Sequence, residues 1–273
     1  MSEPEVVWFG DERCRDVACA GGKGASLAAM SALRLPVPPG FVVASWVLER
    51  SVDAARLRAL VAAGDHAAAE ELVGASQPPR DAILAAYTEL GEGPVAVRSS
   101  ACAEDSEAAS YAGQQETFLN VLGGAELCRR ISACWASFFS ERAVFYRSRK
   151  GSLDDLRMAV VVQRMVDPRK SGVLFTVDPV QRRRDRMIVE AIYGLGEQVV
   201  SGQVTPDHYV VDRDGATTQE DLPNGGVLDD DELAALAELG RSLEETFGGP
   251  QDVEWAIAGG ELYLLQSRPV TTL

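Results

Sequence analysis

The chain has 273 residues, of which 41 are acidic and 26 basic, and its formal net charge is −15. This length suits one large domain or two modest ones. The negative charge argues against binding to nucleic acid or to an anionic membrane surface, because both require a basic face on the protein. A nucleotide is compatible with this charge, since it needs only a local cationic pocket.

The cysteines and the N-terminal residues indicate where the protein works. The five cysteines include no CxxC pair, and an odd number does not suit a disulfide framework. Residues 1–10 lack the basic segment and the apolar run of a signal peptide. No stretch approaches the roughly 20 apolar residues of a membrane span. We therefore expect a cytoplasmic protein with reduced thiols and no membrane contact.

The first part of the chain, up to about Gly93, is rich in alanine and predicts mainly helices. Prolines, glycines and capping residues mark the ends of these helices. Strands are expected at 41–43 and 95–97. The expected helices open near Gly22, run from Ser45 to about residue 63, and cover 65–77, 79–90 and, further along, 124–149.

After Gly151 the periodicity becomes that of strands, expected at 157–166, 172–177, 187–191 and 208–212. One helix, 230–247, has an acidic first turn that suits the helix dipole. Helices and strands do not alternate strictly. This order predicts an α+β fold with two lobes, approximately 1–155 and 156–273.

The C-terminal segment predicts a β-hairpin around Gly259 and Gly260. Apolar and polar side chains alternate on both sides of this turn, so a period of two places them on opposite faces. The apolar set is Val253, Trp255, Ile257, Tyr263 and Leu265. The polar set includes Glu254, Gln266 and Arg268.

The pairing of Glu254 with Gln266 depends on the length of the hairpin loop. With a three-residue loop, 259–261, Glu254 lies opposite Gln266 and both flank Arg268. Facing side chains start about 5 Å apart at Cβ, and oxygen ligands at that spacing suit a Mg²⁺ ion shared with a polyphosphate. With a two-residue loop, Gln266 falls on the Trp255 face instead. A surface hairpin with one salt bridge is the alternative interpretation.

Gly21, Gly22 and Gly24 surround Lys23 where the first helix is expected to open. Glycines let a phosphate approach the backbone, and the amides at a helix N-terminus attract anions. The pattern matches neither the Walker nor the Rossmann fingerprint. Lys23 is therefore either a phosphate ligand or a solvated cap residue.

Two further positions at strand ends are candidates for nucleotide binding. Arg98 follows a predicted strand and precedes two serines, and its structural alternative is an ion pair with Asp105. Gln163 ends another strand, where a glutamine amide and the backbone can read an adenine edge and Met165 can pack on the ring. Its alternative is an ordinary strand end.

Each motif is modest, but their order and spacing together are specific. The chain resembles the nucleotide-binding domain of the phosphoenolpyruvate synthase and pyruvate phosphate dikinase family, which includes rifampicin phosphotransferase-like enzymes. The resemblance implies an ATP-grasp fold with ATP between two lobes. The segments that carry it are 21–27, 37–43, 97–105, 112–121, 163–166, 171–179, 193–199 and 252–268.

The resemblance implies roles for residues at the phosphate end of ATP. Lys23 and Arg98 correspond to the phosphate-binding cations of the family, and Arg268 to the arginine at the γ-phosphate. Gly113 and Thr117 correspond to the lid loop over the phosphates. Lys23, Arg98 and Arg268 are thus the expected catalytic residues, in a reaction that depends on positioning and charge neutralisation.

The resemblance also assigns the base and the metal. Gln163 corresponds to the adenine reader, and Glu254 and Gln266 to the ligands of Mg²⁺. Cys102 stands where the family usually has threonine. The expected cofactors are therefore ATP and Mg²⁺.

The phosphoryl acceptor is the point at which the sequence departs from the family pattern. Family members pass the group to a histidine on a swivelling domain, in a Thr-x-x-Gly-Gly-x-x-x-His motif, and neither His66 nor His208 lies in that setting. We expect a histidine-bearing domain or partner to accept the group. The alternatives are a kinase or ligase that acts directly on a metabolite or antibiotic, and a nucleotide-binding module without turnover.

Overall fold

The computed structural model describes residues 3–102, 116–141, 143–144, 156–200, 202 and 204–271. The chain divides into two compact units, one of Met1–Arg34 with Pro38–Met165 and one of Leu35–Val37 with Val166–Leu273. The boundary expected from the sequence is near residue 155. The units divide later because the strand Met158–Arg164 pairs with two strands of the first unit.

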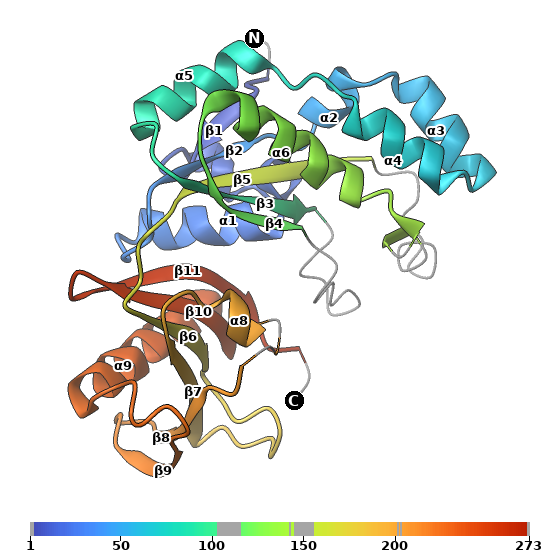
Figure 1. The fold of residues 1–273 in the computed structure, drawn as a ribbon. Helices are drawn as coiled ribbons and strands as arrows, with labels where there is room; N and C mark the ends of the chain where they lie inside the picture. Colours follow the sequence, from blue (N-terminus) through green and yellow to red (C-terminus); the bar gives the residue numbers. More distant parts are fainter. Residues whose placement is uncertain are drawn as a thin grey trace. The chain divides into compact units, whose positions relative to one another are not determined.

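The first unit contains an antiparallel five-stranded sheet with the order β1-β2-β5-β3-β4 (Figure 1). Apolar side chains alternate or run continuously along these strands, as buried strands require. The strands are β1 (Val6–Trp8), β2 (Gly40–Val43), β3 (Val95–Ala101), β4 (Thr117–Val121) and β5 (Met158–Arg164). The expected strands at 41–43, 95–97 and 157–166 are confirmed, and β1 and β4 are additional.

Helices cover both faces of this sheet, with α1 on one face and α6 on the other (Figure 1). Gly24 of α1 packs against the side chains of Val42 and Val161. On the opposite face, Arg130 of α6 lies over the ring of Phe118. The helices are η1 (Glu12–Arg15), α1 (Val17–Ala32), α2 (Val47–Ser51), α3 (Ala54–Ala63), α4 (His66–Gly74), α5 (Arg80–Leu90) and α6 (Gly124–Ser137).

Two helix predictions in this unit are wrong in length. The single helix expected from Ser45 to residue 63 is two helices, because Asp53 accepts a hydrogen bond from the Arg56 amide and starts α3. The Ser45 hydroxyl does not cap a helix; it donates to the carbonyl of Ala18. The helix expected over 124–149 ends at Ser137, where the amide of Phe138 bonds three residues back instead of four.

The second unit contains an antiparallel six-stranded sheet with the order β11-β10-β6-β7-β8-β9 (Figure 1). The three strands expected at 172–177, 187–191 and 208–212 are all found, and β9 is additional. The elements are β6 (Lys170–Phe175), β7 (Arg186–Tyr193), α8 (Glu197–Val200), β8 (Asp207–Asp212), β9 (Thr217–Asp221), α9 (Asp230–Phe247), β10 (Gln251–Ala258) and β11 (Glu261–Pro269).

Helix α9 covers one face of the second sheet, as its predicted apolar stripe requires. Asp229 and Glu232 form a reciprocal capping box at its start. Gly240 lets the helix approach closely, since a Cβ there would lie 3.1 Å from Leu174 and 3.3 Å from the sulfur of Met187. Within the described parts of the chain, no helix combines the length and apolar character needed to cross a membrane.

The C-terminal hairpin differs from the expected one in its loop but not in its central pairing. Ala258 pairs with Glu261, so the loop has two residues instead of three. The register shifts between Glu254 and Trp255, which leaves Leu265 as the extra residue of a β-bulge and restores the pairing of Glu254 with Gln266. The bulge thus compensates for the shorter loop.

Because of the bulge, the residues of β11 near the turn lie on other faces than expected. Trp255 pairs with Leu264 rather than flanking Tyr263 and Leu265. Leu264 is fully buried, whereas Tyr263 and Leu265 are only partly buried. The expected apolar face therefore holds for β10 and is wrong by one residue for the part of β11 next to the loop.

Candidate functional site

The glycine-rich segment of the first unit is held directly against strand β3. Gly21 interrupts α1 with φ +67°, so a second helical segment begins at the glycines, as expected. A Cβ on Gly21 would lie 2.2 Å from the carbonyl oxygen of Ser100. The Ser100 hydroxyl donates to the carbonyl of Ala20 at 2.8 Å and accepts from the amide of Gly24 at 3.1 Å. Only glycine permits both the positive φ and this approach.

Lys23 is anchored to the same strand. Its Nζ donates to the backbone carbonyl of Ser99 at 3.1 Å, and the residue is partly buried. The interpretation of Lys23 as a fully solvated cap residue does not fit this contact. The ammonium group is therefore held beside β3, at the residue between Arg98 and Ser100.

Arg98, Thr117 and Gln163 come from three neighbouring strands and lie on the face that α1 covers. Arg98 pairs with Thr117 on one side and with Val161 on the other, and Gln163 follows Val161 by two residues. Val161 contacts α1 through Gly24. The strand period of two then assigns all three candidates to that face.

The individual environments of these residues differ. Arg98 is buried, with 7% of its surface exposed. Gln163 is 3% exposed, and its Nε2 donates to the carbonyl of Pro38 at 3.3 Å. Gly113, and Asp105 as the alternative partner of Arg98, lie outside the described residues.

The hairpin of the second unit places four polar side chains on the face opposite α9. Glu254 is in register with Gln266, and Asp252 with Arg268. Arg268 donates from Nε to Oδ2 of Asp252 at 2.7 Å, and its Nη2 lies 2.6 Å from the same oxygen. Both contacts use one carboxylate oxygen, and 44% of the Arg268 side chain is exposed.

Asp252 is a site residue that the sequence analysis missed. Burial raises the pKa of its carboxyl group, Arg268 lowers it in part, and the negative charge of Glu254 raises it further. Two carboxylates that repel each other on one face form a set of ligands suited to a divalent cation. The signal was present in the sequence, since position 252 has the same parity as 254, 266 and 268.

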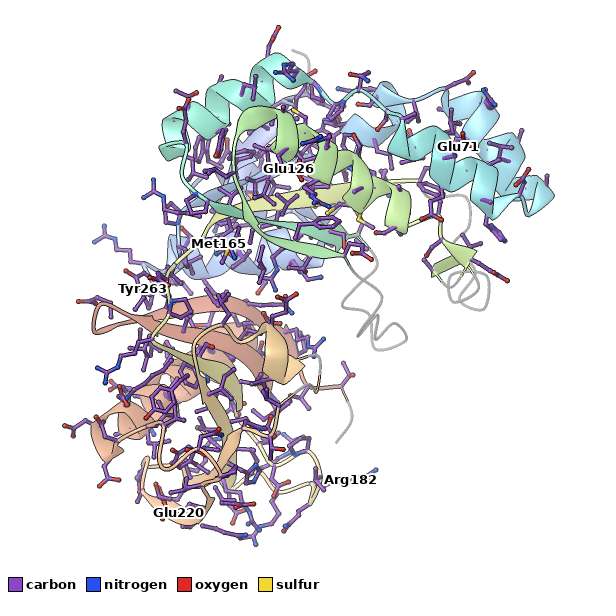
Figure 2. The ribbon with its side chains drawn as sticks, viewed as in Figure 1. Glu71, Glu126, Met165, Arg182, Glu220 and Tyr263 are labelled. Atoms are coloured by element: carbon purple, nitrogen blue, oxygen red, sulfur yellow. The ribbon has the colours of Figure 1, made fainter. Side chains whose placement is uncertain are left out.

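The remaining candidates are accounted for by local structure. His208 lies in β8 with its Nδ1 3.8 Å from Oε1 of Glu190, and His66 is the first residue of α4. Three consecutive arginines, 182–184, lie in the loop between β6 and β7, from which Arg182 projects (Figure 2). Val180 in this loop is 90% exposed, so the tip of the loop is solvated.

Among the described residues, no group of three or more His, Cys, Asp or Glu side chains is placed to hold a metal ion. The hairpin supplies two carboxylates and one amide instead. That is enough for Mg²⁺, which usually keeps several waters and takes one or two protein carboxylates together with substrate phosphates.

Comparison with protein families identifies the chain. Residues 17–224 and 216–273 match the family described as pyruvate phosphate dikinase, AMP/ATP-binding domain. The chain belongs to this family. The match covers both the Lys23 segment and the hairpin that carries Glu254 and Gln266.

Curated relatives agree with this assignment. The chain is 41% identical to a probable phosphoenolpyruvate synthase of Archaeoglobus fulgidus, over 98% of this chain and 42% of the relative. It is 43% identical to a rifampicin phosphotransferase of Streptomyces sviceus, over 94% of this chain and 35% of the relative. It is 33% identical to the phosphoenolpyruvate synthase of Pyrococcus furiosus, over 98% of this chain and 44% of that enzyme. The chain thus spans less than half the length of these relatives.

Proposed function

We propose that the chain is the ATP-binding part of a phosphotransferase of the dikinase type, which cleaves ATP with Mg²⁺ and passes a phosphoryl or pyrophosphoryl group to a carrier histidine outside this segment. The observation that carries the proposal is the family match, which runs through every described candidate residue. An ATP-grasp arrangement, with ATP between the two units and the protein in the cytoplasm, is part of the same proposal.

The cations bind and neutralise the phosphates. Lys23 is held beside β3 by the carbonyl of Ser99, Arg98 is buried in the same strand, and Arg268 is partly exposed and paired with Asp252. Transfer from ATP spreads negative charge over the phosphoryl oxygens, and fixed cations stabilise that charge without reorganising. Gly113 and Thr117 belong to the proposed lid over the same phosphates.

The adenine is assigned to the end of β5. Gln163 donates its Nε2 to Pro38, so its Oε1 is the atom we propose to accept from the adenine amino group. The backbone amides of Arg164 and Met165 already donate to Pro39 and Pro94. Specificity for ATP over GTP would therefore rest on acceptors at this strand end.

Glu254 and Gln266 would hold Mg²⁺, with Asp252 beside them, and the ion would supply charge neutralisation between the β- and γ-phosphates. The oxygen-rich, mutually repelling donor set fits such an ion. Arg268 orients Asp252 through two contacts to its Oδ2 atom.

Calorimetry tests nucleotide binding. Mg²⁺ and ATP should bind, and Lys23→Ala or Arg98→Ala should weaken binding by about tenfold or more, about 1.4 kcal/mol. Arg56→Ala, at an exposed position of α3, is the control and should leave the affinity unchanged. Wild-type affinity in both test variants would remove the phosphate assignment.

The acceptor is tested with ATP labelled in turn at the β- and γ-phosphates. A histidine-bearing partner domain should become labelled and AMP should form, whereas the chain alone should hydrolyse ATP slowly. The rifampicin phosphotransferase relatives favour a second candidate, with a small-molecule antibiotic as the final acceptor. Rapid ADP formation with a labelled small molecule and no partner would contradict the carrier-histidine proposal.

A further inference from the structure

The hairpin of the second unit contains two registers that differ by one residue. Near the loop, Trp255 pairs with Leu264, and beyond the bulge Glu254 pairs with Gln266. If the first register continued through the strands, Gln266 would pair with Val253 and move to the face that α9 covers. The candidate ligands share one face only because the register changes at Leu265.

A hydrogen bond between Ser267 and Gln251 is compatible with the bulged register alone. The Ser267 hydroxyl donates to Oε1 of Gln251 at 3.0 Å, and both residues are buried, 4% and 2% exposed. In the bulged register Ser267 pairs with Val253, which lies on the same face of β10 as Gln251. In the continuous register Ser267 would pair with Asp252, on the opposite face from Gln251.

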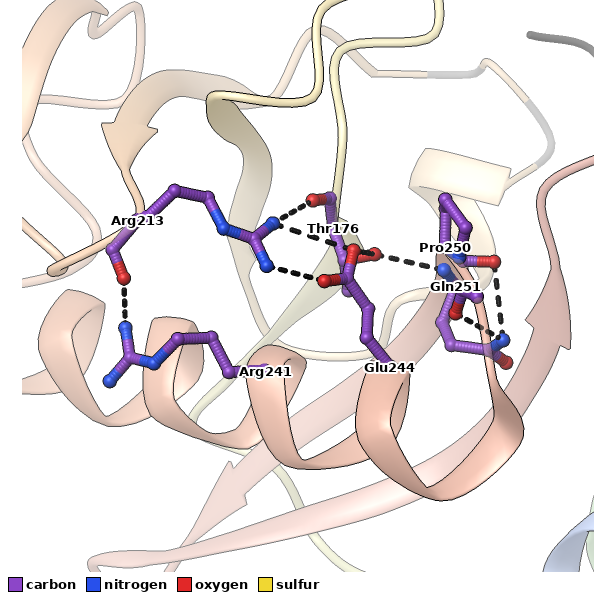
Figure 3. A network of polar contacts seen from close by, with 7 residues as sticks. Thr176, Arg213, Arg241, Glu244, Pro250 and Gln251 are labelled. Carbon is purple, nitrogen blue, oxygen red and sulfur yellow. Dashed lines mark hydrogen bonds and ion pairs between the residues drawn. The ribbon is translucent and has the colours of Figure 1, made fainter.

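A series of hydrogen bonds that includes Thr176 and Glu244 holds Gln251 in place (Figure 3). The backbone amide of Gln251 donates to the Thr176 hydroxyl at 2.9 Å, and that hydroxyl donates to Oε1 of Glu244 at 2.5 Å. Since a hydroxyl has one hydrogen, its donation to Glu244 makes its oxygen the acceptor for Gln251. Thr176 is fully buried.

Arg213 contacts both Thr176 and Glu244 and determines which atom of Thr176 accepts from Gln251 (Figure 3). It donates to the backbone carbonyl of Thr176 at 2.8 Å and forms an ion pair with Glu244. The Thr176 carbonyl thereby turns away from the ladder, and the hydroxyl takes its place as acceptor for Gln251. The ion pair orients the Glu244 carboxylate toward the Thr176 hydroxyl, from which it accepts.

We propose that Ser267 and Gln251, held by Thr176 and Glu244, are positioning residues that maintain the bulged register and so keep Gln266 opposite Glu254. Their functional consequence rests on the proposed function, in which this face binds Mg²⁺ with ATP. In the slipped register the Gln266 amide would lie beneath α9 among apolar side chains, which opposes that register as well. The hydrogen bond between Ser267 and Gln251, called the clamp below, acts together with that cost.

The test compares Ser267→Ala with Ser132→Ala. Both serines are 4% exposed and donate hydrogen bonds, but Ser132 lies in α6 of the first unit. Ser267→Ala should weaken ATP binding about tenfold in the presence of MgCl₂, with no change in EDTA. Ser132→Ala should change neither affinity, and Ser267→Thr, which keeps the hydroxyl, should restore the Mg²⁺-dependent affinity.

Deletion of Leu265 provides a second variant, which separates the effect of the strand register from that of the hydrogen bond between Ser267 and Gln251. Without Leu265 the two registers become one and Glu254 still pairs with Gln266. Ser267→Ala should then have no effect on Mg²⁺-dependent binding, which appears as strong coupling in a double-mutant cycle. Equal effects of Ser267→Ala with and without Leu265 would overturn the clamp.

Interstrand NOEs distinguish this proposal from the proposed function. Ser267→Ala should lose the cross-strand NOEs between Glu254 and Gln266, and their retention would overturn the clamp. If the wild-type chain binds no ATP with MgCl₂, the proposed function fails. The NOEs still decide whether Ser267 holds the register.

Discussion

In the first unit, Lys23 and Arg98 are positioned by backbone packing, with Gly21 pressed against the carbonyl of Ser100 and the Lys23 ammonium on the carbonyl of Ser99. In the second unit, Glu254 and Gln266 are positioned by strand pairing, and a bulge decides which residues face each other. The first arrangement is sensitive to added volume. The second is sensitive to a shift of one residue.

The two units also differ in the charge of their candidate residues. The first unit contributes cations suited to phosphate oxygens, and the second contributes carboxylates and an amide suited to a metal, together with Arg268. A net charge of −15 is thus compatible with an anionic ligand, which needs only local cations such as Lys23 and Arg98. The following variants act on one unit or the other.

Gly21→Ala should produce the largest effect, because it disturbs the backbone packing of the first unit. A positive φ with extended ψ, 67° and 175° at Gly21, costs about 1–3 kcal/mol for a non-glycine residue, and overpacking adds about 1–3 kcal/mol. The free energy of unfolding in urea should fall by that sum, and ATP binding should be lost.

Gly123→Ala is the matched control for Gly21→Ala. Gly123 has φ +86° and ψ 142°, a positive φ with extended ψ as at Gly21, but a Cβ there would have no neighbour within 4 Å. It should cost only the backbone contribution, about 1–3 kcal/mol, and leave ATP binding intact. Equal losses in the two variants would show that the contact with Ser100 has no energetic role.

Glu254→Gln should act on the second unit without unfolding it, since Glu254 is only partly buried. The change removes a proposed metal ligand, so Mg²⁺-dependent ATP turnover should fall by about 100-fold, about 2.7 kcal/mol. Glu261→Gln, at an exposed position of the same hairpin, should retain turnover. Wild-type turnover in Glu254→Gln would mean that the hairpin is structural only.

Thiol labelling should give the smallest effect and report on the first unit alone. Burial raises the pKa of Cys14 to about 12 and that of Cys19 to about 11. Because thiolate forms only as pH approaches the pKa, roughly one Cys19 in a thousand is ionised at pH 8. Cys102, at the end of β3 and partly exposed, should therefore react first with a disulfide reagent.

ATP without Mg²⁺ should slow the labelling of Cys102 roughly tenfold at ten times its Kd, because bound nucleotide would cover the end of β3. Cys102→Thr should abolish the fast phase. Labelling that ATP does not slow would place the nucleotide away from this strand end, even if calorimetry shows binding.

Local sequence patterns predicted most of the elements. The α9 helix, the α5 helix and the strands of the second sheet other than β9 follow from periodicity and caps within a few residues of each element. The split between α2 and α3 was not foreseen, because Asp53 competes as a cap and the Ser45 hydroxyl bonds to Ala18, 27 residues away. Helix propensity depends on the local segment, so it cannot predict a hydrogen bond to a residue far along the chain.

The candidate residues show the same division. The alternation of polar and apolar residues indicated the Glu254 face, and Asp252 has the parity that belongs to it. The loop length and the bulge at Leu265 were beyond that pattern, because register depends on the Ser267–Gln251 bond and on α9 packing beneath the sheet.

Motif order along the chain was sufficient to assign the family, since glycines, cations and carboxylates recur there at characteristic spacings. The chain alone could not indicate that Lys23 is tied to Ser99, or that Gly21 lies against Ser100, because these contacts join residues more than seventy positions apart. Backbone atoms meet at such distances only when whole elements pack, and that packing is a property of the folded units rather than of any local segment.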